Sequence, residues 1–425
     1  MVKQEYIDKL VNIQGFFVQE IVYIQEGEST KLKIIINRKE PHFMCSCGLA
    51  YSTYYDSEIR EVQDLSYGPY EEVYLVFTQC RIDCTTCGIK TEVFDWVEPR
   101  VRYTMRLGAA VAVACEETRS LKSIAEQFGL HWETVKEIDK KALERKVPAV
   151  GSQSPAVIAI DEFSIRKRHS YGTTVINAQN SSVLYVGKDR REESLRPFFE
   201  ALGPEKCKLI EAVAMDMWKP YLKAVEQNCP QAAIVFDPFH IIQAYGRDVV
   251  DKVRAEEYKK ATASAREAMK GSRYILLKNK VNLDRSQGEH VRLKDLLHLN
   301  RKISKVYILK DDLKVLWRYK SEAWARKFFH SWYRRAIYSR IEPLKDFARM
   351  LKRHIEGIIN HCKYQIHTGI LEGINNKIKV IKRIAYGFRD IDYFFLKIRG
   401  AEGVRIFVYL AFDHIGIRSP KYTAN

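Results

Sequence analysis

The order of apolar runs between residues 156 and 240 constrains the fold of this chain more than any other feature. Short apolar runs separated by polar turns predict three successive strands, at residues 156–160, 173–178 and 182–186. Helical and apolar patterns then alternate: helix 192–202, strand 209–215, helix 220–227, strand 232–236 and a helix from residue 239. This succession predicts an α/β sheet that begins with hairpins and continues with helical crossovers.

Two of these expected strands end in a carboxylate. Asp161 follows the first strand and Asp216 follows the fourth. The strand order is that of a ribonuclease-H-like domain, in which the first and fourth strands are neighbours, so we expect Asp161 and Asp216 to lie together at their carboxyl ends. Asp237 after the fifth strand is the competing candidate, but Pro238 favours a turn there and we prefer Asp216. Aspartates at strand ends are also common turn formers.

A third carboxylate, Glu372, stands in the amphipathic segment 369–379. Lys379 is seven residues further on, about two helical turns away and on nearly the same face, where it can meet a DNA backbone. Two Asp and one Glu can hold a pair of Mg²⁺ or Mn²⁺ ions, which is the ligand set that metal-dependent phosphodiester cleavage needs. Because Glu and Lys occur at this spacing on most surface helices, Glu372 is a candidate only together with the two aspartates.

Two close cysteine pairs lie among strand-like runs near the N-terminus. Cys45 and Cys47 form the first pair, and Cys84 and Cys87 form the second, which Gly88 follows. Four thiolates in two tight turns predict a tetrahedral Zn²⁺ site, although the first pair is one residue shorter than the usual spacing. Cys80 is an alternative ligand that we expect to be packed, and four ordinary buried cysteines are the alternative to a metal site.

Residues 120–138 have the spacing of a helix-turn-helix. Ser120 is placed to cap the first helix and Gly129 to make the turn. The second helix would then begin with the residues that contact bases and phosphates in this motif, namely Trp132, Glu133, Thr134 and Lys136. The alternative is a helical hairpin with no DNA contact.

Composition points to the same kind of partner. The chain has 425 residues, enough for several modules, and 70 Lys and Arg against 53 Asp and Glu give a net charge of +17. This balance favours a polyanionic partner such as DNA, with a merely solvated basic surface as the alternative. No apolar run reaches the ~20 residues that span a bilayer and no signal peptide is recognisable, so we expect a soluble intracellular protein without membrane contact.

Between residues 255 and 351 the chain is helical, basic and aromatic. A buried helical core explains its mixed aromatic spacing better than base stacking does. We expect five segments: a zinc-binding β module (1–100), a helix-turn-helix (101–150), the first part of an α/β core (151–254), a helical insertion (255–351) and the final core helices (352–425).

Five segments together resemble the ISL3-family insertion-sequence transposases. These are IDEFSIRK at 160–167, AMDMWKPY at 214–221, IVFDPFH at 234–240, LEGINNKIK at 371–379 and RIAYGF at 383–388. The resemblance implies a DDE transposase whose ribonuclease-H-like core is interrupted by a helical insertion, with Asp161, Asp216 and Glu372 as its Mg²⁺-binding triad. The family usually has CxxC at the first cysteine pair, from which Cys45 and Cys47 depart.

This family implies binding of double-stranded DNA at the terminal inverted repeats, strand cleavage, and transfer of the freed 3′-hydroxyl to target DNA. Two ends must be processed together, so a homodimer or larger assembly on DNA is expected, in the bacterial cytoplasm and associated with the nucleoid. The alternatives are a DNA-binding repressor and a nuclease derived from a transposase that lacks strand transfer.

Overall fold

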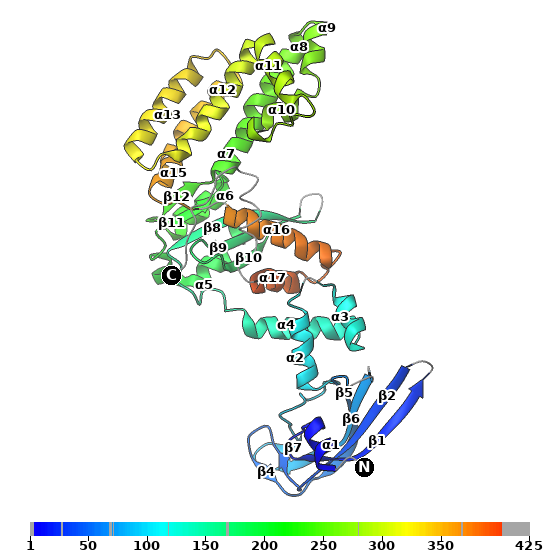
Figure 1. Cartoon of the computed structure of the whole chain (residues 1–425). Coiled ribbons are helices and arrows are strands. Elements are labelled where there is room, and N and C mark those ends of the chain that lie inside the picture. The colour runs from blue at the N-terminus through cyan, green and yellow to red at the C-terminus, as the bar shows by residue number, and fades with distance from the viewer. Residues whose placement is uncertain are drawn as a thin grey trace, which may run out of the picture. The chain divides into compact units, whose positions relative to one another are not determined.

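The computed structural model of the chain divides into two compact units (Figure 1). The first comprises residues 1–146 with 381–396, and the second comprises 147–380 with 397–425. The residues that the structure describes are 4–26, 29–67, 70, 72–117, 119–166, 170–278, 280–366 and 369–401. The part of the expected final core segment beyond residue 401 therefore lies outside the described residues.

The first unit begins with helix α1 (Gln4–Val11) and a sheet in the order β1-β2-β6-β5, with β7 also paired to β6 (Figure 1). Its strands are β1 (Phe16–Glu26), β2 (Ser29–Arg38), β5 (Asp56–Asp64), β6 (Glu72–Cys84) and β7 (Gly88–Thr91). Alternate residues of β6, including Val73, Leu75 and Phe77, are buried in the core of this sheet. The strand-like runs expected near the N-terminus are present as β1, β2 and β6, whereas the polar β5 does not follow from an apolar run.

A two-stranded ribbon, three helices and residues 381–396, which include most of α17 (Ile391–Gly400), complete this unit. The ribbon pairs β3 (Phe43–Met44) with β4 (Ala50–Tyr51). The helices are α2 (Met105–Ala114), α3 (Leu121–Phe128) and α4 (Trp132–Lys146).

The sheet of the second unit has the strand order β10-β9-β8-β11-β12. Its strands are β8 (Val157–Arg166), β9 (Ser170–Asn177), β10 (Val183–Lys188), β11 (Ala212–Met215) and β12 (Ala233–Phe236). β8, β9 and β10 pair antiparallel in hairpins, whereas β11 pairs parallel with both β8 and β12. The crossovers are α5 (Arg196–Cys207) and α6 (Lys219–Asn228), and α7 (Pro238–Tyr245) follows β12. The first and fourth strands are therefore neighbours, as expected.

Helices fill the chain from α7 to residue 362 and enclose their own hydrophobic core. After the π-helical segment Gly246–Asp251 they are α8 (Lys252–Lys260), α9 (Ala263–Met269), α10 (Ser272–Leu277), α11 (Glu289–Leu299), α12 (Arg301–Val315), α13 (Glu322–Ile337), α14 (Glu342–Arg353) and α15 (Ile355–Ile359). Trp332 is fully buried and Phe329 nearly so, which confirms a helical core, whereas Trp324 is 59% exposed.

The insertion returns to the sheet at β12. The side-chain amide of Asn360 donates a 2.8 Å hydrogen bond to the carbonyl oxygen of Ile234. Gly357 in α15 lies against the ring of Phe236, where a Cβ atom would approach ring carbon Cε2 to 2.4 Å. Since α7 leaves the sheet directly after β12, the insertion starts and ends at the same strand.

A lysine is buried inside this helical core. Lys310 is only 1% exposed, and its ammonium donates to the carbonyl oxygens of Leu276 and Leu277 at the end of α10. The ammonium also lies 4.8 Å from the centre of the Tyr307 ring. Burial lowers the pKa of Lys310 to about 8.

Candidate active site and cysteine cluster

Asp161 lies on β8, and Asp216 directly follows β11, the parallel neighbour of β8 in the second unit. The paired residues of β8 and β11 end at Ala159 opposite Ala214, and continuing this register by two residues sets Asp161 beside Asp216. The expectation that Asp161 ends its strand is wrong, because β8 continues to Arg166. It continues because β9 pairs with β8 beyond this point, with Asp161 opposite Thr174, although β11 has already ended.

The carboxylate of Asp161 is buried and hydrogen-bonded. The backbone amide of Glu162 donates to its Oδ1 at 2.8 Å, and the side-chain amide of Asn375 donates to its Oδ2 at 2.6 Å. Burial raises the pKa of Asp161 to about 6, and the nearby charge of Asp216 acts in the same direction. A cation bound here would relieve the cost of holding this carboxylate ionised.

Asp216 follows β11 and is half-buried. The backbone amide of Trp218 donates to its Oδ1 at 3.0 Å. Burial raises the pKa of Asp216, and the negative charges of Glu162 and Asp237 add to the effect. The sheet edge therefore concentrates negative charge that a divalent ion can neutralise.

Asp237, the competing candidate, caps the N-terminus of α7. Its Oδ1 accepts a 2.8 Å hydrogen bond from the backbone amide of Phe239, which is the turn role that Pro238 indicated. His240, on the first turn of α7, places Nε2 3.7 Å from Oδ2 of Asp237 and 3.9 Å from Oδ1 of Asp161. His240 is a residue of this site that the apolar patterns do not predict, although its position three residues after Asp237 indicates that the two can meet on one helix face.

Glu372 stands on α16 (Gly369–Ile384), whose residues Leu371, Ile374 and Ile378 are buried. Glu372 itself is exposed, and the residue that contacts Asp161 is Asn375, three positions later and on the same face. Among the described residues, the oxygens of Asp161, Asp216 and Glu372 do not gather closely enough for one ion. The structure thus brings the helix of Glu372 to Asp161 through Asn375.

The donor set at this edge fits a hard divalent cation. Oδ1 of Asn375 is buried and has no hydrogen-bond partner among the described residues. Such an amide oxygen beside a buried carboxylate is a ligand that Mg²⁺ and Mn²⁺ accept. Asp161, Asp216 and Asn375 therefore offer oxygen ligands of the expected kind.

Lys379, the expected DNA contact on α16, is exposed, and its ammonium donates to Oδ1 of Asn376 at 3.1 Å. Its position leaves it accessible to a phosphate.

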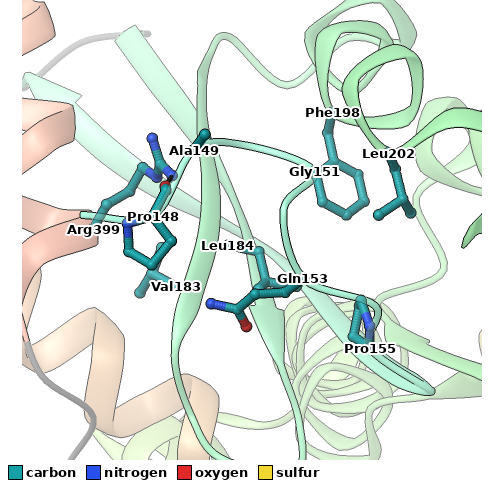
Figure 2. Close-up of a pocket in the computed structure, with 10 residues that line it drawn as sticks. All are labelled: Pro148, Ala149, Gly151, Gln153, Pro155, Val183, Leu184, Phe198, Leu202 and Arg399. Atoms are coloured by element: carbon teal, nitrogen blue, oxygen red, sulfur yellow. Dashed lines mark hydrogen bonds between the residues drawn. The ribbon is translucent and has the colours of Figure 1, made fainter. Parts of the chain in front are cut away.

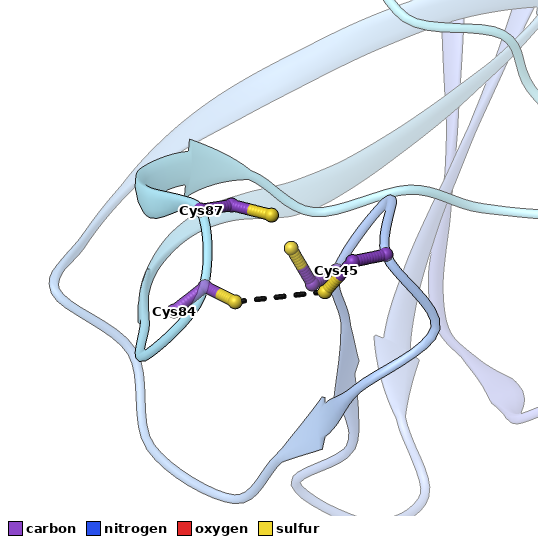
Figure 3. Close-up of side chains that lie close together, drawn as sticks. Cys45, Cys84 and Cys87 are labelled. Carbon is purple, nitrogen blue, oxygen red and sulfur yellow. Dashed lines mark hydrogen bonds between the residues drawn. The ribbon is translucent and has the colours of Figure 1, made fainter.

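The four predicted cysteines of the first unit form one cluster (Figure 3). The Sγ atoms of Cys45, Cys47, Cys84 and Cys87 all lie within 4.8 Å of one another. Tetrahedral zinc with ~2.3 Å bonds needs sulfurs about 3.8 Å apart, so this cluster can hold one Zn²⁺ ion. The short first pair still delivers both sulfurs, because Gly48 at φ +90° turns the chain immediately after Cys47.

The cluster already favours a thiolate at one position. A hydrogen bond from the Tyr51 hydroxyl, 3.3 Å from Sγ, lowers the pKa of Cys84 to about 6. The hydrogen bond with Cys47 raises the pKa of Cys87 to about 12. Cys80 is buried on β6 outside the cluster, where burial raises its pKa to about 11, so it is packed as expected.

The helix-turn-helix has the expected local geometry. The Ser120 hydroxyl accepts a 3.1 Å hydrogen bond from the amide of Ser123 and caps α3, and Gly129 ends α3 at φ +61°. Trp132 and Glu133 are exposed at the start of α4, and Thr134 is half-buried. Lys136 is 3.4 Å from Asp390, which lies in the same unit, so a phosphate would compete with this carboxylate.

Comparison with known proteins decides the family. The ISL3 profile described as transposase matches residues 158–398, which is more than half of the chain. A second profile, described as the helix-turn-helix domain of transposase family ISL3, matches residues 92–143. The chain belongs to the ISL3 family of transposases.

Relatives of this transposase match it over nearly their whole length. The transposase for insertion sequence element IS1001 of Bordetella parapertussis is 38% identical over 405 residues, covering 94% of this chain and 98% of the relative. The transposase for insertion sequence element IS1557 of Mycobacterium tuberculosis (strain H37Rv) is 26% identical over 416 residues, covering 90% and 91%.

Two further observations bear on the site. Within the described residues, no helix of this transposase is long and apolar enough to cross a membrane. A pocket in the second unit is lined by residues 148–155, β10, α5 and Arg399, and contains none of the candidate carboxylates (Figure 2).

Proposed function

We propose that this transposase cuts DNA at the inverted repeats that end its own element and joins the freed 3′-hydroxyl to target DNA. Its second unit would be a ribonuclease-H-like core in which Asp161, Asp216 and Glu372 form the catalytic triad. The observation that carries this proposal is the register that sets Asp161 beside Asp216, together with the 2.6 Å bond by which Asn375 brings the helix of Glu372 to Asp161.

The protein side chains have separate roles in this proposal. Asp161, Asp216 and Asn375 would hold Mg²⁺ or Mn²⁺ at this edge, and the bound ion would supply Lewis-acid stabilisation of charge on the reacting phosphate. Asp161 and Asp216 provide fixed negative charge on rigid strands, and Asn375 orients the Asp161 carboxylate. Glu372 lies about one turn before Asn375 on the same face of α16 and would complete the ligand set when DNA is bound. No covalent protein–DNA intermediate is required, so no Ser or Tyr nucleophile is assigned.

The first unit would select the DNA ends. Trp132 and Glu133 are exposed at the start of the second helix of a helix-turn-helix, where base edges are normally read. Thr134 and Lys136 on the same helix, and Lys379 on α16, would bind phosphates. Zn²⁺ held by the four-cysteine cluster would stabilise the β module, and two copies acting on two ends imply a dimer or larger assembly on DNA.

The test is a cleavage and joining assay on DNA that carries the ends of the element, with Mg²⁺ or Mn²⁺. Asp161→Asn, Asp216→Asn and Glu372→Gln should each reduce cleavage by at least about 10³-fold and leave end binding in gel shifts intact. Glu205→Gln, at an exposed position of α5, is the matched control and should cleave normally.

Normal cleavage by Asp161→Asn would refute the triad. Loss of cleavage in Asp237→Asn but not in Asp216→Asn would move the second position to Asp237. Nicked products without joined products from the wild-type protein would identify a nuclease without strand transfer.

A further inference from the structure

An arginine lies between two aromatic rings beside the candidate carboxylates. The guanidinium of Arg190 is 4.3 Å from the centre of the Tyr171 ring and 5.0 Å from the centre of the Trp218 ring. The indole N–H of Trp218 donates a 2.9 Å hydrogen bond to the carbonyl oxygen of Arg190. We call these three residues the Arg190 sandwich, and they come from β9, the segment after β10 and the turn after β11.

Two direct contacts connect this sandwich to the candidate active site. The backbone amide of Trp218 binds Oδ1 of Asp216 at 3.0 Å, so the tryptophan is fixed two residues beyond a candidate metal ligand. Nη1 of Arg190 donates to Glu162, the residue after Asp161, at 3.2 Å. Successive bases of a DNA strand are ~3.4 Å apart along the helix axis. Because Trp218 and Arg190 contact Asp216 and the neighbour of Asp161 directly, the sandwich borders the place where a strand cleaved at the carboxylates would lie.

The sandwich combines fixed positions with exposed surface. Trp218 is 37% exposed although its backbone and its indole N–H are both hydrogen-bonded, and the side chain of Arg190 is 35% exposed. An aromatic ring that is held in place and open to solvent is a platform for a nucleobase, and an adjacent guanidinium matches a phosphate. If these three residues only held two loops together, the Trp218 ring would not need to be exposed to solvent.

We propose that the Arg190 sandwich binds the nucleotide that flanks the cleaved phosphate, with Trp218 stacking on its unpaired base and Arg190 contacting its phosphate. This inference rests on the proposed cleavage function and assigns it a further positioning site. Removing a base from the duplex is unfavourable, and stacking on Trp218 would offset part of that cost. The residue that opens the DNA end would then be distinct from the residues that hold the metal.

The experiment measures single-turnover cleavage of end-bearing DNA that is either fully paired or mismatched at one position near the cut. Trp218→Ala should slow cleavage of paired ends by about 5- to 100-fold, which corresponds to the loss of one stacked base. A mismatch at the flanking position should restore most of the rate, because that base is already unpaired. Trp218→Phe should retain most activity on both substrates, whereas Trp218→Leu, which keeps apolar bulk without a π-face, should behave like alanine.

Two control variants remove a tryptophan and an arginine that lie outside the Arg190 sandwich. Trp324→Ala removes an exposed tryptophan that stacks with Lys327 at 5.0 Å on α13, and Arg191→Ala removes the exposed neighbour of Arg190 that pairs with Asp189. Both should cleave like the wild type. Arg190→Lys should weaken cleavage of paired ends because lysine keeps the charge but loses the planar stack.

Equal slowing of paired and mismatched ends by Trp218→Leu would show a structural role only and would overturn the inference, as would normal cleavage of paired ends. If Trp218→Ala does not fold, the comparison of Phe and Leu at this position decides the question. The proposed function fails separately, through normal cleavage by Asp161→Asn, so the two failures are distinguishable.

Discussion

The buried lysine of the helical insertion makes stability depend on pH in a direction that the structure specifies. Lys310 has a pKa of about 8 in the folded chain against an ordinary value of 10.5. Between these two values the unfolded chain binds more protons than the folded chain, so the free energy of unfolding rises with pH. A pKa difference of roughly 2.5 lowers the free energy of unfolding by about 3 kcal/mol when lysine is protonated in both states. About 2 kcal/mol of this loss disappears as the pH rises from 7 to 9.5.

The perturbation that isolates this effect is Lys310→Met. Methionine has a similar length and does not titrate, so the stability difference between wild type and variant removes the pH dependence of all other groups. This difference should change by about 2 kcal/mol in favour of the wild type from pH 7 to pH 9.5. The difference at a single pH is less informative, because the variant also leaves the carbonyl oxygens of Leu276 and Leu277 without their donor.

Urea unfolding under reducing conditions, followed by tryptophan fluorescence, to which the buried Trp332 of the insertion contributes, provides the measurement. Trp332 reports on the same core, since its indole N–H donates to the carbonyl oxygen of Leu309, the neighbour of Lys310, at 2.9 Å. Glutamine can still donate to a carbonyl oxygen but carries no charge. The stability difference between wild type and Lys310→Gln should therefore change with pH in the same way as that for Lys310→Met. A stability difference that stays constant from pH 7 to pH 9.5 would refute the reasoning.

Three further predictions concern separate parts of the chain. Gly357→Ala should destabilise the second unit by about 1–3 kcal/mol through overpacking against Phe236, measurable as a lower urea midpoint, and an unchanged midpoint would contradict the close packing. Gly129→Ala should cost about 1 kcal/mol because α3 ends there at φ +61°, and it should weaken binding of end DNA in gel shifts, whereas unchanged stability and binding would argue against this turn. Cys87→Ser should lower the bound zinc measured by metal analysis from one ion per chain and lower the melting temperature of the protein, and equal zinc content in variant and wild type would exclude Cys87 as a ligand.

Local sequence signals predicted the parts of this fold that local geometry determines. Ser120 and Gly129 mark the cap and the turn of the helix-turn-helix, because each acts on backbone groups within a few residues. The strands of the α/β sheet were predictable from apolar runs for the same reason. The polar strand β5 was missed because it lies at the edge of its sheet and most of its residues are not buried.

The contacts that build the candidate site are not local, and the sequence did not specify them. Asn375 meets Asp161 across the whole helical insertion. Its spacing from Leu371 and Ile378 indicates that it lies beside the buried face of α16, but helical periodicity does not reveal its partner. The continuation of β8 beyond Asp161 depends on its pairing with β9, which apolar spacing alone does not reveal. Trp218 and Arg190 likewise meet only once three separate segments have reached the same edge of the sheet.

The return of the helical insertion to β12 has a consequence for how such chains can change in length. Asn360 bonds to Ile234 and Gly357 packs on Phe236, so the segment leaves and re-enters the sheet at one short strand. Closing a longer loop between two fixed points costs only about 0.6 kcal/mol for each doubling of its length. Adding helices to the insertion or removing them would therefore leave unchanged the point beside β12 from which the chain continues to α16. The insertion can therefore be longer or shorter without changing the positions of the candidate carboxylates.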